Sequence, residues 1–115
     1  MSLDVYLVEN KPVEVYSRNI THNLGKMAGC VDVSSGGGLT LYHVLWRPDE
    51  NGFKLAYELI PYLARGYAEL IGYPEKYKAY NPTNGWGSYD GLVEFVFSYL
   101  QSCRENPNAV IKVSR

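Results

Sequence analysis

Apolar residues alternate with polar ones at both ends of the chain, whereas between these ends they recur at the spacing of a helix. An alternation of this kind places successive side chains on opposite faces of a β-strand. Residues 3–7 and 13–16 show it on either side of a turn at 9–12, which predicts a β-hairpin. Residues 109–113 show it again, so a strand near the other end is expected to join the hairpin in one sheet.

Two long helices are predicted between the strands. One apolar stripe runs from Phe53 to Ile71, and Pro61 within it predicts a kink or a restart. A second helix is expected between Ser88, as N-cap, and Pro107. Its apolar stripe consists of Leu92, Val96, Tyr99 and Cys103.

Shorter elements fill the rest of the chain. Residues 20–29 and 74–80 are expected to be short helices, with Asn19 or Thr21 as the N-cap of the first. Glycine and polar residues predict loops at 30–38 and 81–88. The apolar run 39–46 fits either a short helix or an extended segment.

The order of these elements predicts an α+β fold in which a small antiparallel sheet is covered on its apolar face by two long helices and shorter ones. The 115 residues, 1–115, are expected to form one domain, because two cores of half this size would be marginally stable. Hydrophobic residues make up 46% of the chain, which is enough for a packed core.

The charge balance argues against one class of function. Lys and Arg number 11 and Asp and Glu 12, whereas a protein that binds DNA nonspecifically is strongly basic. We therefore expect no direct DNA binding. Charged residues interrupt the first twenty positions, and the longest uncharged stretch, 33–46, is shorter than the roughly 20 apolar residues of a membrane helix. A cytoplasmic protein with two reduced cysteines is expected, without a membrane partner.

Catalytic and metal-binding patterns are weak. His22 and His43 lie 21 positions apart with no cysteine cluster beside them, so no metal site is expected. Cys103 falls on the apolar stripe of its helix, which predicts an inert buried thiol. Asp90 and Glu94 lie one helical turn apart and are interpreted as surface charge. The chain is therefore predicted to be no enzyme and to need no cofactor.

Two segments combine polar side chains with the start of a helix. Residues 16–23 carry hydrogen-bonding groups where a strand leads into a helix, and the amides of a helix N-terminus favour anions. A capping network is the alternative there. In residues 81–89 two glycines flank Trp86, so a flat ligand can approach closely. The alternative is that Trp86 fills the core. The glycine run 36–38 suits an anion nest but lacks the Lys and Ser/Thr of a phosphate loop.

Three motifs are spread over residues 19–93, which are most of the chain: Asn19-Ile20-Thr21-His22-Asn23-Leu24 followed by Met27-Ala28, then Leu45-Trp46-Arg47-Pro48, then Asn81-Pro82-x-Asn84-Gly85-Trp86-Gly87-x-Tyr89 with Gly91-Leu92-Val93. In these motifs the chain resembles an uncharacterised family of small proteins from bacteria and their phages. It differs from that family by its short hairpin and its extra segment from Cys30 to Gly38. The family has no assigned activity, and the resemblance implies a role in the conflict between phage and host.

We predict a non-enzymatic binding protein for a small planar anionic ligand, such as a nucleotide or a nucleotide-derived signal. Aromatic rings would stack on the base, asparagines would bind its polar edges, and arginines and helix N-termini would face phosphate. In the phage setting that the resemblance implies, the protein would sequester a host immune messenger. The residues assigned to this site are Tyr16, Arg18, Asn19, His22, Asn23, Trp46, Arg47, Asn84, Trp86 and Tyr89. His22 and Trp86 are expected to lie close together.

The alternative function is a protein-interaction module. Tyrosine accounts for 11 of the 16 aromatic residues, and Tyr and Trp are enriched in the hot spots of protein interfaces. Such a patch would bind a host partner or a second copy of the chain, forming a homo-oligomer. A concave site in which Trp86, Tyr89 and His22 converge favours the ligand, whereas a flat exposed aromatic patch favours the partner.

Overall fold

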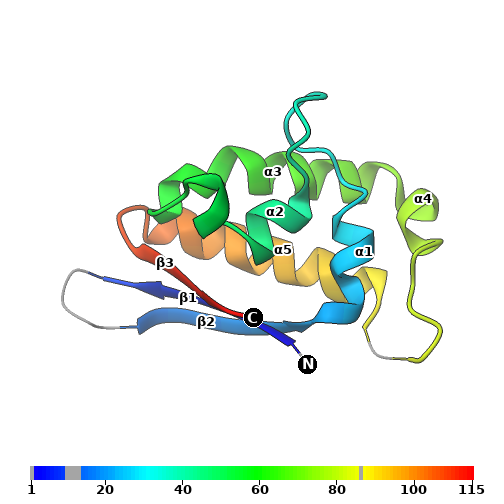
Figure 1. The fold of residues 1–115 in the computed structure, drawn as a ribbon, viewed down its shortest axis with the longest axis horizontal. Helices are drawn as coiled ribbons and strands as arrows, with labels where there is room; N and C mark the ends of the chain where they lie inside the picture. The colour runs from blue at the N-terminus through cyan, green and yellow to red at the C-terminus, as the bar shows by residue number, and fades with distance from the viewer. Residues whose placement is uncertain (1, 10–13, 86) are drawn as a thin grey trace.

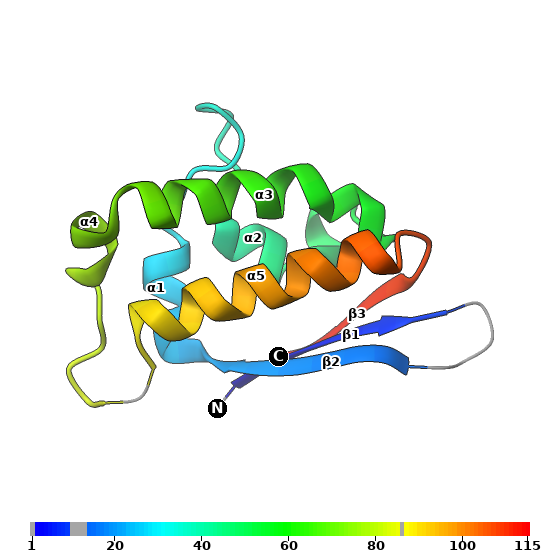
Figure 2. The same ribbon diagram turned by 180° about the vertical axis from the view of Figure 1, so that it is seen from behind.

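The computed structural model describes residues 2–9, 14–85 and 87–115. A three-stranded antiparallel sheet forms one layer, α5 lies next to it, and α3 packs on the side of α5 away from the sheet (Figures 1 and 2). This is the α+β fold that the sequence predicts. The elements are, in chain order, β1 (Ser2–Val8), β2 (Glu14–Thr21), η1 (His22–Leu24), α1 (Gly25–Ala28), α2 (Leu41–Trp46), η2 (Asp49–Asn51), α3 (Ala56–Gly72), α4 (Pro74–Lys78), α5 (Tyr89–Glu105) and β3 (Val110–Ser114).

The strands pair in the order β2-β1-β3, so both the predicted hairpin and the predicted third strand are confirmed. The side chains of β1 alternate between the core and the outer face, and Leu3, Val5 and Leu7 are fully buried. Val5 lies opposite Arg18 on β2 and Val113 on β3, which puts these three side chains on the inner face. Most of the turn expected at 9–12 lies outside the described residues.

α3 is a single helix that continues through Pro61, so the predicted restart there does not occur. A proline removes the hydrogen bond to the carbonyl four residues earlier, which here belongs to Tyr57 in the first helical turn. Tyr57 is exposed, so water can solvate this carbonyl. The helix begins at Ala56, three residues later than predicted, because the preceding residues pair with β3: the Ile111 amide donates to the Lys54 carbonyl at 2.9 Å.

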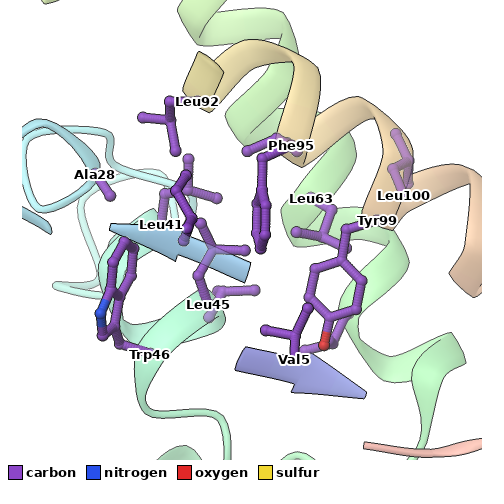
Figure 3. Close-up of a cluster of buried hydrophobic side chains, with 14 of the residues drawn as sticks. Val5, Ala28, Leu41, Leu45, Trp46, Leu63, Leu92, Phe95, Tyr99 and Leu100 are labelled. Carbon is purple, nitrogen blue, oxygen red and sulfur yellow. The ribbon is translucent and has the colours of Figure 1, made fainter. Parts of the chain in front are cut away.

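α5 supplies much of the core. The Ser88 hydroxyl accepts a hydrogen bond from the Gly91 amide at 3.1 Å, which confirms the predicted N-cap. Phe95 and Tyr99 project from α5 toward the sheet, above Val5, and meet side chains of α2 and α3 (Figure 3). The predicted stripe of Leu92, Val96, Tyr99 and Cys103 is fully buried.

The short elements differ from the prediction at their edges. Ile20 belongs to β2, and a 3-10 turn from His22 to Leu24 followed by α1 replaces the single helix predicted for 20–29. Thr21 is the N-cap, since its hydroxyl accepts from the Asn23 amide at 3.3 Å. The undecided run 39–46 contains the helix α2. Among the helices of the described residues, none has the combined length and apolar character needed to cross a bilayer.

Stability should fall at alkaline pH. Burial raises the pKa of Cys103 from its usual 9.0 to about 12 and raises the pKa of Tyr99 above its usual 10.0. Both groups hold their protons more tightly in the folded chain than in the unfolded chain. Their contribution to the free energy of unfolding is therefore fully present below about pH 9 and is lost as the pH rises toward the folded pKa values. We expect the free energy of unfolding to fall by up to about 1.4 kcal/mol per pH unit for each group.

Urea denaturation between about pH 8 and pH 11 measures this decline. In the unfolded chain the cysteine thiol loses its proton at about pH 9 and the tyrosine hydroxyl at about pH 10. The variant Cys103→Ala lacks the thiol, so its free energy of unfolding should begin to decline about one pH unit higher than that of the wild type. A profile identical to that of the wild type would show that Cys103 does not contribute.

Candidate functional site

A hollow of about 310 Å³ lies where the end of β2, the end of α2 and the segment after β3 meet. We call it the His22 pocket. Its volume is at the lower end of the range for small-molecule sites. Its walls are His22, Tyr42, Trp46, Arg47 and Arg115. Three of these residues, His22, Trp46 and Arg47, were assigned to the site from the sequence.

Aromatic rings form one side of the pocket. Trp46 is the last residue of α2, and Tyr42 stacks on it from one turn earlier, with ring centroids 5.4 Å apart and planes 14° apart. The indole Nε1 donates a hydrogen bond to Nδ1 of His22 at 2.7 Å. This bond puts the proton of the neutral imidazole on Nε2, which makes that nitrogen a donor. Trp46 is only 2% exposed, so a ligand would mainly contact Tyr42 and His22.

The geometry of α2 explains why these rings are held together. The helix begins with a capping box in which Nδ1 of His43 accepts from the Thr40 amide at 3.0 Å, so His43 has a structural role. Residues four apart on a helix are neighbours, which brings Tyr42 onto Trp46. The helix ends at Trp46, and Pro48 follows two residues later.

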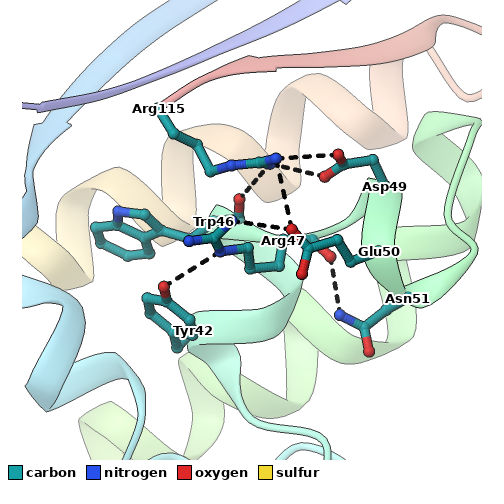
Figure 4. Close-up of polar contacts among 7 residues, drawn as sticks. All are labelled: Tyr42, Trp46, Arg47, Asp49, Glu50, Asn51 and Arg115. Carbon is teal, nitrogen blue, oxygen red and sulfur yellow. Dashed lines mark hydrogen bonds and ion pairs between the residues drawn. The ribbon is translucent and has the colours of Figure 1, made fainter.

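Two arginines form the other side (Figure 4). Nε of Arg47 donates to the Tyr42 hydroxyl at 3.4 Å, and its Nη1 lies 2.9 Å from Glu50. Nη1 of Arg115 donates to the Trp46 carbonyl at 2.9 Å and to Asp49 at 2.8 Å. Hydrogen bonds from Arg115 lower the pKa of the Asp49 carboxyl, and those to Asp49 raise the pKa of Arg115. The pocket therefore carries two guanidinium groups, each paired with a carboxylate at its rim.

Arg18 and Asn19 line a second, separate hollow of about 260 Å³ between β2 and the start of α5. The Arg18 guanidinium binds both carboxylate oxygens of Glu94, at 2.8 and 2.5 Å, and this pairing lowers the pKa of Glu94. Glu94 is therefore the ion-pair partner of Arg18. The charge of Arg18 is matched within the chain, and its side chain does not line the His22 pocket.

The two segments singled out in the sequence do meet. A Cβ placed on Gly87 would lie 2.7 Å from Cγ2 of Thr21 and 3.0 Å from Cγ of Leu24, so the loop before α5 packs directly against the residues on either side of His22 and Asn23. The expected proximity of His22 and Trp86 cannot be assigned from this contact, because Trp86 lies outside the described residues. It stays a prediction.

The structure does not bring the other described residues of the assigned site to the His22 pocket. Tyr16 is half-buried against the core, stacked on Tyr99, with its hydroxyl 3.0 Å from Ser98. Tyr89 is buried against α3, where its hydroxyl donates to the Leu70 carbonyl at 2.5 Å. Asn23 and Asn84 are exposed, and neither lines the described pocket walls.

The glycine run does not form a free anion nest in the described part of the chain. The Asp32 carboxylate accepts hydrogen bonds from the amides of Ser34, at 2.9 Å, and Gly36, at 2.7 Å. These bonds lower the pKa of Asp32, so the chain supplies its own anion to the loop.

A larger hollow of about 530 Å³ lies nearby and is lined in part by Arg65, Glu69 and Lys76. It has one aromatic wall, Tyr77, and both of its cations contact other groups of the chain.

Two residues of the His22 pocket had no assignment from the sequence. Tyr42 carries a usable signal, because a helical interpretation of 39–46 places it one turn before Trp46. Arg115 carries none, since it reaches the pocket through the sheet pairing of β3. In the part of the chain that the structure describes, no group of three or more His, Cys, Asp or Glu side chains is arranged to hold a metal ion.

Comparison with known proteins gives no further guide to this site. No protein-family model, curated protein or solved structure matches the chain. Its function is inferred from the chemistry of the pocket residues.

Proposed function

We propose that the chain is a non-enzymatic binding protein for a small planar anion of the nucleotide class, including nucleotide-derived signals, and that the ligand occupies the His22 pocket. The observation that carries this proposal is the meeting of two guanidinium groups with a stacked aromatic pair in one hollow. Stacking on Tyr42 or His22 suits a base, and Arg47 and Arg115 suit a phosphate.

The existing ion pairs leave the arginines available to a ligand. Glu50 and Asp49 have side chains 55% and 57% exposed, and exposed ion pairs contribute about 0 to 1 kcal/mol. A phosphate that approaches from solvent can replace these carboxylates at small cost, and it forms stronger charge-assisted hydrogen bonds. The Nε2 proton of His22 adds a neutral donor beside the two cations.

The experiment is a thermal-shift and calorimetric titration with adenosine and guanosine monophosphates, with the corresponding nucleosides as neutral controls. We expect the nucleotides to raise the melting temperature more than the nucleosides do. Arg47→Gln should weaken nucleotide binding about 10-fold to 100-fold, the range of a lost hydrogen bond to a charged group. Arg18→Gln is the matched control, since its side chain is as exposed as that of Arg47 but lines the other hollow.

Equal effects of the two substitutions would contradict this site. Nucleotides without any effect on the melting temperature would contradict the ligand class. Native mass spectrometry of protein purified from its host then shows whether a different small molecule is retained.

A further inference from the structure

One side of α3 carries a row of apolar side chains that are exposed or only half-buried. They recur every three or four residues, which places them along one side of the helix. Tyr57 is 52% exposed and Ile71 is 50% exposed, at the two ends of the row. The row consists of Tyr57, Ile60, Ala64, Tyr67 and Ile71.

α5 continues this apolar surface. Phe97 is 45% exposed, and its ring lies 5.4 Å from that of Tyr67, so the two helices contribute to one patch. Val93, one turn before Phe97, is half-buried beside it. Figure 2 shows α3 and α5 side by side on this face with no element in front of them. Apolar surface of this kind marks an interaction site.

The charges along the same side of α5 are self-complementary. Asp90, Phe97 and Arg104 are spaced seven residues apart, so they lie on one stripe with the aromatic ring midway between an acid and a base. Both charged side chains are exposed, and neither has an ion-pair partner among the described residues. When a second copy of this stripe lies alongside in the opposite direction, each acid faces a base and the two aromatic rings face each other.

We propose that this face binds a second copy of the chain, with the two α5 helices antiparallel across a two-fold axis at Phe97. The symmetry places Asp90 of each copy against Arg104 of the other, at both ends of the contact. The two Phe97 rings meet at the centre, flanked by Tyr67 of each copy. An unrelated partner would need its own stripe with a base, an aromatic ring and an acid at the same spacing. A second copy supplies that stripe when it lies antiparallel to the first. This inference goes beyond the proposed function and does not depend on it.

The test is sedimentation-velocity centrifugation of the whole chain over a range of concentrations. We expect the wild type to reach twice its monomer mass of 13.0 kDa. Asp90→Arg should weaken association more than about 10-fold, because it places like charges opposite each other at both ends of the contact. Arg104→Asp should do the same. The double variant carrying both changes should recover the dimer, since each contact again joins opposite charges.

Glu14→Arg is the control, because it makes the same change in net charge at an exposed site on β2. It should leave association unchanged. Circular dichroism confirms that each variant is folded before it is compared. A wild-type chain that stays monomeric up to about 100 µM would overturn the proposal. So would a folded Asp90→Arg variant that dimerises normally, or a folded double variant that remains as weak as the single ones.

Discussion

Gly87→Ala should lower the free energy of unfolding by about 2 to 6 kcal/mol, a large share of the 5 to 15 kcal/mol typical of a domain. Gly87 has a φ of +95°, where a side chain adds strain of about 1 to 3 kcal/mol. The new Cβ would also lie 2.7 Å from Cγ2 of Thr21 and 3.0 Å from Cγ of Leu24. Leu24 is buried, so relieving this overlap requires the core to shift, at a further cost of about 1 to 3 kcal/mol.

Gly85→Ala separates the two contributions. Gly85 has a similar φ of +78°, but a Cβ there meets no described atom within 4 Å. Its cost should be that of the backbone alone, about 1 to 3 kcal/mol. Urea denaturation of both variants measures the difference. Equal destabilisation would show that Gly87 is required only for its backbone conformation and that the loop can move away from Thr21.

Trp46→Ala should be comparably damaging, at about 3 to 5 kcal/mol. The substitution removes a large buried side chain and leaves a cavity at the end of α2. It also removes the donor that satisfies Nδ1 of His22 and the ring on which Tyr42 stacks. Because the pocket walls depend on that ring, nucleotide binding should be lost in whatever fraction of the variant remains folded.

Trp46→Phe is the informative partner of this variant. It keeps an aromatic ring for Tyr42 but has no N–H, so its cost should be that of a smaller ring and one lost hydrogen bond, about 1 to 2 kcal/mol. Chemical denaturation gives the stability of both variants, and titration of the folded Phe variant gives its affinity. If Trp46→Phe binds nucleotides as the wild type does, the hydrogen bond to His22 does not organise the pocket.

The fold could be predicted because its signals are local. The alternation in residues 3–7 and 109–113 and the helical stripe from Leu92 to Cys103 each require only neighbouring positions to be interpreted. The errors arose where a distant segment decides the local structure. Residues before Ala56 are extended because they pair with β3, and Ile20 continues β2 because it lies opposite Leu3 on β1.

The candidate site could be predicted only in part for the same reason. His22, Trp46 and Arg47 were chosen because polar and aromatic residues near helix ends are visible in the sequence. Arg115 joins them only after the sheet has formed, and the partner of Arg18 lies 76 positions away at Glu94. Tyr16 and Tyr89 illustrate a different limit, since the amphipathic tyrosine side chain suits a ligand wall and a core edge equally well. Only tertiary packing distinguishes the two roles.

The strand order β2-β1-β3 has a consequence for biosynthesis. β1 is the central strand, and its Asp4 pairs with Ser114 on β3, 110 positions later. Until β3 has been translated, β1 can pair with β2 only, so one of its edges stays open. An open strand edge favours aggregation and chaperone binding. The nascent chain therefore carries an open β1 edge until β3 has left the ribosome.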